Sequence, residues 1–157
     1  MPNWCSNRLL VEGLSFEEFK KLYYEDGTFT FNKVIPAPED AARLIEEWGT
    51  KWDCSDWEVF DYETGEGFTA DFTTAWSPPN PIVQRLMENH PDAKIKLMYY
   101  ESGCDFCGVH NEFGDSEYPF MKFDFEIKNL DEDLKSYIEY EREWFDEEEE
   151  DEEEEEE

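Results

Sequence analysis

The sequence has few basic residues, few histidines and cysteines, and no long apolar run. Its 157 residues include 13 Lys or Arg, 2 His and 4 Cys. Proteins that bind DNA, RNA or anionic lipid use clusters of Lys and Arg to neutralise phosphates, and no basic patch is visible here. The apolar runs are too short to span a bilayer, and the first residues lack the apolar core of a signal peptide. We therefore expect a cytoplasmic protein that binds neither nucleic acid directly nor a membrane.

The four cysteines do not form a complete metal-binding pattern. Cys5 and Cys54 are isolated, whereas Cys104 and Cys107 form a C-x-x-C pair that His110 follows three residues later. A structural zinc ion needs four ligands, which usually come from two such pairs. Cys104, Cys107 and His110 are thus a weak candidate metal site. The favoured interpretation is that the cysteines are small core residues in a reducing compartment.

No catalytic motif stands out. The sequence contains no P-loop, HExxH, GxSxG or EF-hand pattern. Carboxylates are so numerous that many pairs of them would fit a general acid and base, so this signal carries no information. We predict that the protein is not an enzyme and holds no cofactor.

What the sequence has in excess is negative charge. It contains 43 Asp and Glu residues, for a formal net charge of −30. Every residue from 146 to 157 is acidic, and without these 12 the chain keeps 31 acidic and 13 basic residues, a net charge of −18. The body is therefore acidic in its own right. We expect a single domain over residues 1–145, followed by a polyacidic tail over 146–157 that like-charge repulsion keeps disordered.

Aromatic residues supply a core despite this charge, since the chain has 13 Phe, 8 Tyr and 6 Trp. Alternating apolar and polar positions predict strands at 4–12, 28–34, 57–62, 67–75, 94–101, 106–112 and 120–127. Helical spacing predicts a helix capped by Ser15, helices at about 39–48 and 80–89, and a C-terminal helix from Leu130 to Phe145. The side chains predicted to face inward on the first two helices are Phe16, Phe19, Leu22 and Tyr23, then Ala41, Leu44, Ile45 and Trp48.

The predicted elements follow the order β-α-β, an insertion, and β-α-β. This order is typical of a split-βαβ, ferredoxin-like sandwich of the α+β class. The additional strands and the C-terminal helix are then inserted and appended elements.

Several separated stretches resemble a known family. Residues 1–7 (MPNWCSN), 48–53 (WGTKWD) and 74–79 (TAWSPP) resemble the YubB-like family of plasmid- and phage-borne proteins, and residues 100–103 (YESG) and 106–108 (FCG) are similar in position and type. The resemblance covers about residues 1–127 and implies a ferredoxin-like domain and an origin on a mobile element. It implies no activity, and the acidic tail lies outside its pattern.

The tryptophan-rich motifs have two interpretations. They form either a surface that stacks on a flat ligand or, as we favour, a packed aromatic core whose indole N–H groups bond to loop carbonyls. The residues concerned are Trp4, Trp48, Lys51, Trp52, Asp53 and Trp76. Lys51 and Asp53 could pair with each other, which would fit either interpretation. A sheet bearing aromatics also resembles RNA-recognition sheets, but the net charge argues against that function.

The acidic tail is the candidate partner-binding segment. An extended chain places one charge every ~3.4 Å, close to the ~3.4 Å spacing of phosphates along one DNA strand. We hypothesise that the protein binds a basic, nucleic-acid-handling host protein, as a nucleic-acid mimic or anti-defence inhibitor encoded by a mobile element. The tail residues predicted to contact this partner are Asp146, Glu147, Glu148, Glu149, Glu150, Asp151 and Glu152.

Other functions fit the same composition. The protein could be an immunity or antitoxin protein that caps a basic toxin, or a small metal- or ligand-binding enzyme built on the tryptophan motifs and residues 104–110. The charge could also serve solubility, high-salt adaptation or nonspecific binding of cations.

Overall fold

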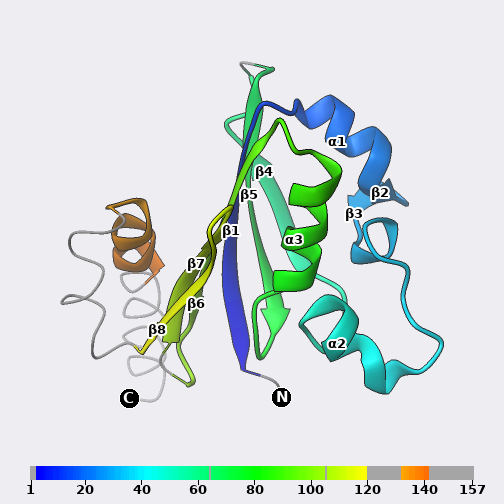
Figure 1. Ribbon diagram of the computed structural model, residues 1–157. Helices are drawn as coiled ribbons and strands as arrows, with labels where there is room; N and C mark the ends of the chain where they lie inside the picture. The colour runs from blue at the N-terminus through cyan, green and yellow to red at the C-terminus, as the bar shows by residue number, and fades with distance from the viewer. Residues whose placement is uncertain (1–2, 64, 105, 120–131, 142–157) are drawn as a thin grey trace, which may run out of the picture.

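The computed structural model describes residues 3–63, 65–104, 106–119 and 132–141. Its main sheet has six strands in the order β4-β5-β1-β6-β7-β8 (Figure 1). These strands are β1 (Trp4–Glu12), β4 (Ser55–Phe60), β5 (Gly67–Ala75), β6 (Lys94–Glu101), β7 (Phe106–Asn111) and β8 (Gly114–Pro119). Two short strands, β2 (Tyr24–Glu25) and β3 (Thr28–Phe29), form a separate two-stranded sheet.

Strand β1 lies between the two strands that α3 (Asn80–Asn89) connects. It pairs antiparallel with β5 on one side and with β6 on the other, and β4 pairs antiparallel with β5. Strands β5 and β6 therefore run in the same direction with β1 between them, which is the split-βαβ arrangement. The predicted ferredoxin-like fold of the α+β class is confirmed. Strands β7 and β8 continue the sheet beyond β6 as antiparallel neighbours.

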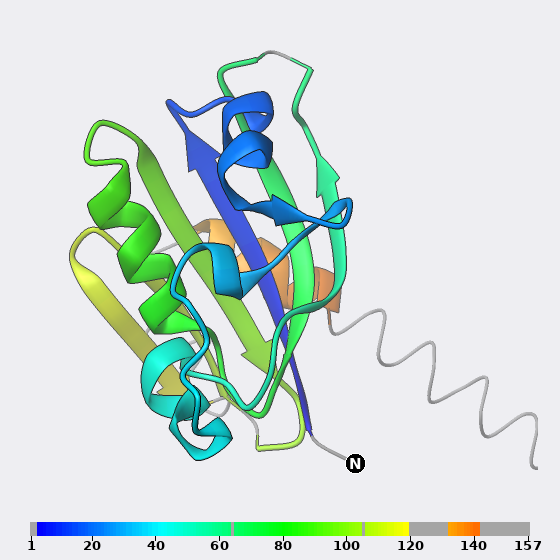
Figure 2. The same cartoon turned by 90° about the vertical axis from the view of Figure 1, so that its right-hand side faces the viewer.

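Helices cover both faces of the sheet. Helices α1 (Phe16–Tyr23), α2 (Leu44–Trp48) and α3 lie over one face, which we call the first face (Figures 1 and 2). The helical residues 132–141 lie over the other, the second face. No helix among the described residues combines the length and the apolar character that a membrane crossing would need.

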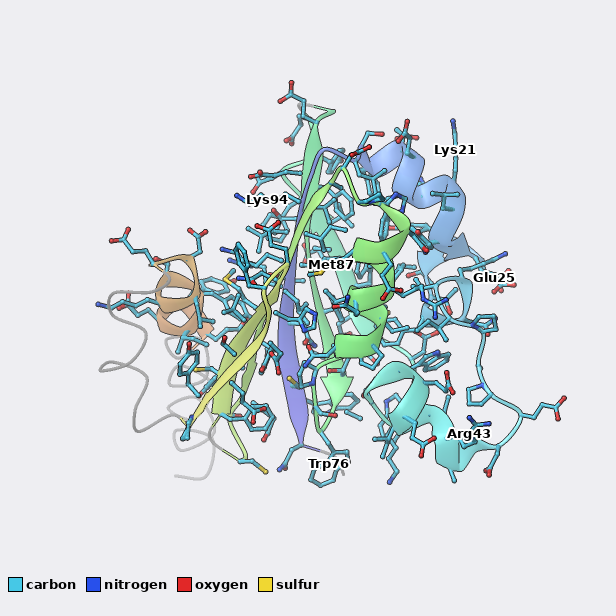
Figure 3. All side chains as sticks on the ribbon, in the orientation of Figure 1. Lys21, Glu25, Arg43, Trp76, Met87 and Lys94 are labelled. Carbon is cyan, nitrogen blue, oxygen red and sulfur yellow. The ribbon has the colours of Figure 1, made fainter. Side chains whose placement is uncertain are left out.

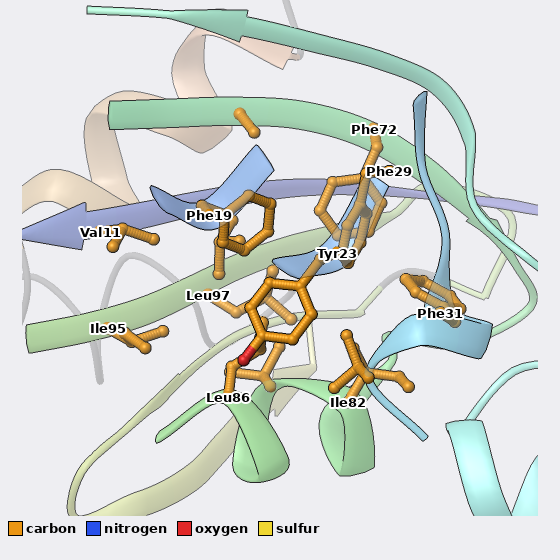
Figure 4. Packing of buried hydrophobic residues seen from close by; sticks show 14 of the residues in the cluster. Val11, Phe19, Tyr23, Phe29, Phe31, Phe72, Ile82, Leu86, Ile95 and Leu97 are labelled. Atoms are coloured by element: carbon orange, nitrogen blue, oxygen red, sulfur yellow. The ribbon is translucent and has the colours of Figure 1, made fainter. Parts of the chain in front are cut away.

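Each face of the sheet has its own core because successive side chains of a strand point in opposite directions. On the first face, Leu97 belongs to a large aromatic cluster in which the Phe19 ring centroid lies 4.8 Å from that of Phe68. Figure 4 shows Tyr23 of α1 beside Leu86 of α3 in this cluster. On the second face, the next residue of β6, Met98, packs in a smaller cluster whose helical members are Leu134, Tyr137 and Ile138.

Most of the predicted elements have the predicted bounds. The strands at 4–12, 67–75 and 94–101 and the helix at 80–89 are β1, β5, β6 and α3. The strand expected at 57–62 is β4, which lies two residues earlier, and the strand expected at 106–112 is β7, which ends one residue earlier. Ser15 caps α1 as predicted, because its hydroxyl accepts a hydrogen bond from the backbone N–H of Glu18 at 3.2 Å.

The predicted strand at 28–34 is wrong beyond Phe29. Residues Phe31–Lys33 form a 3-10 helix, because Asp53 accepts hydrogen bonds from the Thr30 hydroxyl and from the Phe31 backbone N–H. The remote carboxylate thus turns the chain away from the extended conformation that the alternating side chains predict.

On two helices, some of the residues predicted to face inward are exposed. Leu22 is 53% exposed because α1 packs through Phe19 and Tyr23, one turn apart. The helix expected at 39–48 is a 3-10 turn at Ala41–Arg43 followed by the short α2. Of its expected inward residues, Trp48 is buried, whereas Ile45 is 60% exposed and Ala41 is also exposed.

Some predictions fall outside the described residues, and one strand was not predicted. The strand at 120–127, the ends of the C-terminal helix at Leu130, Trp144 and Phe145, and the tail at 146–157 all lie outside the described ranges. Strand β8 was missed because its sequence, GDSEYP, shows no apolar alternation. It is defined instead by its register against β7.

Candidate functional site

The second face of the sheet is hollowed over β1, β4 and β5, beside the helical residues 132–141. Two adjoining cavities of about 560 and 430 Å³ share Glu58, Asp71 and Tyr140 in their linings, and we call them together the acidic groove. Six carboxylate residues line the groove: Asp56, Glu58, Asp61, Asp71, Asp133 and Glu141. Arg8 is the only basic residue among the described residues that line it.

Strand alternation and a β-bulge place these carboxylates together. Asp71 lies between the buried residues of β5, so its side chain points to the second face. The register of β4 against β5 shifts by one residue between Ser55 and Glu58, which is a bulge. Within it, Asp56 has a φ of 57°, in the left-handed region. Because a bulge re-aims the side chains around it, Asp56 and Glu58 both line the groove.

Arg8 is held by a carboxylate and three aromatic rings. Its Nε and Nη2 atoms donate hydrogen bonds to Oδ1 and Oδ2 of Asp71, each at 2.8 Å. Its guanidinium carbon lies 5.2, 5.0 and 5.4 Å from the ring centroids of Phe60, Tyr137 and Tyr140. The hydrogen bonds to Asp71 raise the pKa of Arg8, so the group stays charged. The groove therefore already holds one guanidinium in the geometry that this group favours.

Glu141, at the end of the helical residues 132–141, is a partly buried carboxylate in the groove. Burial raises the pKa of Glu141, and the nearby Asp71 carboxylate adds to that rise. Side-chain hydrogen bonds with Ser6 and Tyr137 and the Arg8 guanidinium lower the pKa and offset part of the rise. A buried carboxylate near like charge costs stability, and hydrogen bonds and an opposite charge offset part of that cost. A cation bound nearby would further favour the ionised form of Glu141.

The predicted tryptophan set is divided between the core and the surface. Trp48 is buried and its Nε1 donates to the carbonyl of Ile35 at 2.9 Å, as the structural interpretation expects. Trp4 is 41% exposed and lines the acidic groove, and Trp52 packs edge-on against it with ring centroids 6.1 Å apart. Trp76 is exposed at the end of the sheet with a φ of 71° (Figure 3). The motif is therefore not one ligand surface.

Asp53 and Lys51 do not form the expected pair. Both residues lie in the described part of the chain, and no ion pair joins them. The Asp53 carboxylate accepts instead from the backbone N–H groups of Phe31 and Cys54, at 3.0 and 2.8 Å. Asp53 therefore has a structural role in the loop.

The structure does not bring Cys104, Cys107 and His110 together. Cys104 is exposed in the β6–β7 turn, while Cys107 is buried in the core of the second face. His110 points to the first face, where its Nε2 lies 3.3 Å from the side-chain oxygen of Gln84 in α3. Residues three apart on a strand face opposite ways, which explains the separation. The described residues contain no group of three potential metal ligands.

Negative charge alone does not single out the acidic groove. Exposed carboxylates also lie on the first face, on α1 and α2 for example, and the predicted tail residues 146–152 lie outside the described ranges. What distinguishes the groove is the combination of carboxylates, aromatic walls and a hollow. One signal of the groove is present in the sequence. Arg8 and Asp71 are oppositely charged residues at outward positions of β1 and β5, and the register makes them partners.

These features define an acidic α+β protein of the ferredoxin-like fold. A family model described as the ferredoxin-like domain in Api92-like protein matches residues 47–157, so the chain belongs to this family. The matched range includes the acidic tail, which the resemblance over 1–127 had left outside. The chain is also similar to the uncharacterized protein YubB of Escherichia coli (strain K12), with 29% identity over 91 residues. That match covers 57% of this chain and 62% of YubB, less than two thirds of its length. No solved structure matches the chain significantly.

Proposed function

We propose that the protein binds a basic surface of another protein through the acidic groove. The observation that carries this proposal is the set of six carboxylates that line one hollow with a single guanidinium among them. Carboxylates on strands hold fixed positions, so they can match a pattern of Lys and Arg side chains. The remaining charge of the body and tail, within a total of −30, would steer a basic partner toward this face and raise the association rate.

The partner that this chemistry fits best is a protein that handles nucleic acid. Such a protein carries a basic groove shaped for phosphates, and a carboxylate surface can occupy it in place of DNA or RNA. Direct binding to a polynucleotide is disfavoured by the same net charge. If the gene is carried by a plasmid or phage, as the YubB-like resemblance implies, a host defence or DNA-transaction protein is the expected target, and the protein would act as its inhibitor.

In this proposal the groove and the tail have different roles. The groove supplies specificity because three of its carboxylates, Asp56, Glu58 and Asp71, are held on strands β4 and β5. The tail contributes long-range attraction, which salt screens over a Debye length of ~10 Å at 0.1 M. The complex should therefore weaken strongly as ionic strength rises, mainly through a slower association.

A pull-down from host lysate tests the proposal. The baits are the full chain, a form that ends at Phe145, and a groove variant that combines Asp56→Asn, Glu58→Gln and Glu141→Gln. A matched control removes three exposed charges elsewhere, with Glu25→Gln, Glu39→Gln and Glu46→Gln. We expect the first two baits and the control to recover one nucleic-acid enzyme, whose DNA or RNA binding the protein then inhibits, and the groove variant to lose it.

Other outcomes would contradict the proposal. Recovery of the same partner by the groove variant would place the binding site elsewhere. Recovery of many ribosomal and other basic proteins by the long form alone would show a nonspecific tail. Recovery of a basic toxin that binds no nucleic acid would favour an immunity protein in place of a nucleic-acid mimic.

A further inference from the structure

Three exposed tryptophans lie at one end of the main sheet. Trp4 is the first residue of β1, and Trp76 directly follows β5, which pairs with β1 at this end. Trp52 packs edge-on against Trp4, with ring centroids 6.1 Å apart. Trp4, Trp52 and Trp76 are 41%, 38% and 44% exposed, and we call them together the tryptophan end. Since a tryptophan has ~250 Å² to bury, these fractions leave ~300 Å² of mostly apolar surface exposed. Apolar surface of this extent in one place often has a function.

Buried residues of the same sequence motifs hold the backbone of the tryptophan end. The Thr50 hydroxyl, which is fully buried, donates to the carbonyl of Ala75 at 2.9 Å and accepts from its backbone N–H at 3.1 Å. The backbone N–H of Trp76 donates to the carbonyl of Asn3 at 2.8 Å. The three separated motifs that contain Asn3, Thr50 and Trp76 therefore meet here. A backbone that is fixed in advance loses little conformational entropy when a partner binds.

The backbone of Trp76 has an unfavourable conformation for a bulky residue. Its φ of 71° lies in the left-handed region, where a large side chain costs stability and a glycine does not. The side chain is 44% exposed, so burial within the protein returns only part of this cost. Figure 3 shows Trp76 at this end of the sheet. A tryptophan that is buried by a partner would account for the choice of residue.

Charge indicates which kind of partner covers the tryptophan end. Trp4 lines the smaller cavity of the acidic groove together with Asp56 and Glu58, so a molecule that covers its ring also meets these carboxylates. The exposed Lys51, next to Trp52, offsets only part of this charge. Single-stranded nucleic acid stacks on aromatic rings, but its phosphates would be repelled by a chain with a net charge of −30. A second copy of the chain would bring the same negative charge. A protein with an apolar recess beside Lys and Arg side chains fits both features.

We propose that the tryptophan end is the apolar anchor of the interface with the basic partner, where Trp4, Trp52 and Trp76 insert into an apolar recess bordered by cations. This inference rests on the proposed function and adds the residues that hold the partner after the charges have attracted it. Tryptophan is enriched among the few interface residues that carry most of the binding energy. The carboxylates beside the rings would pair with the cations at the border of the recess.

Calorimetric titration of the full chain with two matched peptides tests this inference at low ionic strength. Both peptides carry the same number of lysines spaced by glycine, and one has leucines where the other has serines. Burying one leucine fully corresponds to at least about tenfold in affinity, so we expect the leucine peptide to bind about tenfold more tightly. A short single-stranded oligothymidylate probes base stacking and should not bind.

Variants separate the apolar contribution from the charge. Trp4→Ser, Trp52→Ser and Trp76→Gly keep every charged residue, and each should reduce the leucine preference without changing the affinity for the serine peptide. The control Leu22→Ser removes a side chain that is 53% exposed on α1, and it should leave the preference unchanged. The groove variant should weaken both peptides by the same factor. Circular dichroism checks folding, and Trp76→Gly, which relieves the positive φ, keeps the test valid if Trp4→Ser does not fold.

The outcomes distinguish this inference from the proposed function. Equal affinities for the two peptides, both weakened in the groove variant, would overturn the apolar anchor and leave the acidic groove as the binding surface. A leucine preference that survives all three tryptophan substitutions would also overturn the anchor. Binding of oligothymidylate that the tryptophan variants lose would show a base-stacking surface in its place. Peptide affinities that do not change in the groove variant would overturn the proposed function and this inference with it.

Discussion

The pairing of Arg8 with Asp71 predicts a large energetic coupling, which a double-mutant cycle can measure. The changes are Arg8→Met, which keeps the length of the side chain, and Asp71→Asn, which keeps its shape. Two hydrogen bonds of 2.8 Å join the charged groups, whose side chains are 22% and 31% exposed. Breaking a fully buried pair costs ~3–5 kcal/mol, and an exposed pair is worth ~0.2–1 kcal/mol. We therefore expect a coupling free energy of about 2 kcal/mol.

The single substitutions should differ in size. Arg8→Met also removes the contacts with Phe60, Tyr137 and Tyr140, each worth ~0.5–1 kcal/mol, so it should cost about 3 kcal/mol. Asp71→Asn should cost less because those contacts remain. Urea unfolding at neutral pH provides the free energies. Arg8→Met also removes the only guanidinium that lines the groove with its six carboxylates. The loss of this positive charge should lower the free energy of unfolding further.

A matched control comes from an exposed pair of the same chemistry. Arg43 and Glu47, at 3.2 Å on the surface of α2, have side chains that are 57% and 36% exposed. The cycle Arg43→Met with Glu47→Gln should give a coupling of ~0.3–0.5 kcal/mol. If the Arg8–Asp71 coupling were no larger than this, the guanidinium would not be held as described.

Four further predictions concern Glu141, two tryptophans and the segment from Cys104 to His110. The raised pKa of Glu141 means that the native state binds more protons than the unfolded chain at pH values above the ordinary 4.5, so this group lowers stability as the pH rises. Glu141→Gln should therefore raise the urea midpoint at pH 7 and not at pH 4, and parallel pH profiles of the two proteins would contradict this. Trp48→Ala should cost ~3–5 kcal/mol, whereas Trp76→Gly should be neutral or stabilising because a glycine adopts the positive φ without strain. Chelator or added zinc should leave the melting temperature unchanged, because Cys107 and His110 face opposite ways; a shift of several degrees would show a site built differently.

The sequence was sufficient for elements whose periodicity agrees with their packing. Strands β1, β5 and β6 alternate in register with a buried face, and α3 presents Ile82, Val83 and Leu86 to the core, so their bounds were predictable. It failed where a remote residue decides the local conformation. At 28–34 the side chains alternate as in a strand, but Asp53, about twenty residues later, winds the backbone into a 3-10 turn.

The acidic groove was not predictable for a related reason. Its six carboxylates come from β4, β5, the β4–β5 loop and residues 132–141, and in a chain with 43 acidic residues no spacing marks them. The bulge that turns Asp56 into the groove has no sequence signal, since it exists only in the register of β4 against β5. The tail could be proposed as a binding segment because its charge can be read from the sequence. A hollow between a helix and a sheet cannot be read from it.

Hydrogen–deuterium exchange on the full chain, with and without the recovered partner, tests most directly whether partner binding uses the second face. Strand β4 has a neighbour on one side only within the described sheet, so its amides should respond to a ligand in the groove. We predict slower exchange in β4 and in residues 132–141 of the complex, with α1 and α2 unchanged. Slower exchange confined to α1, α2 and α3, or none in the described residues, would contradict the assignment of binding to the acidic groove.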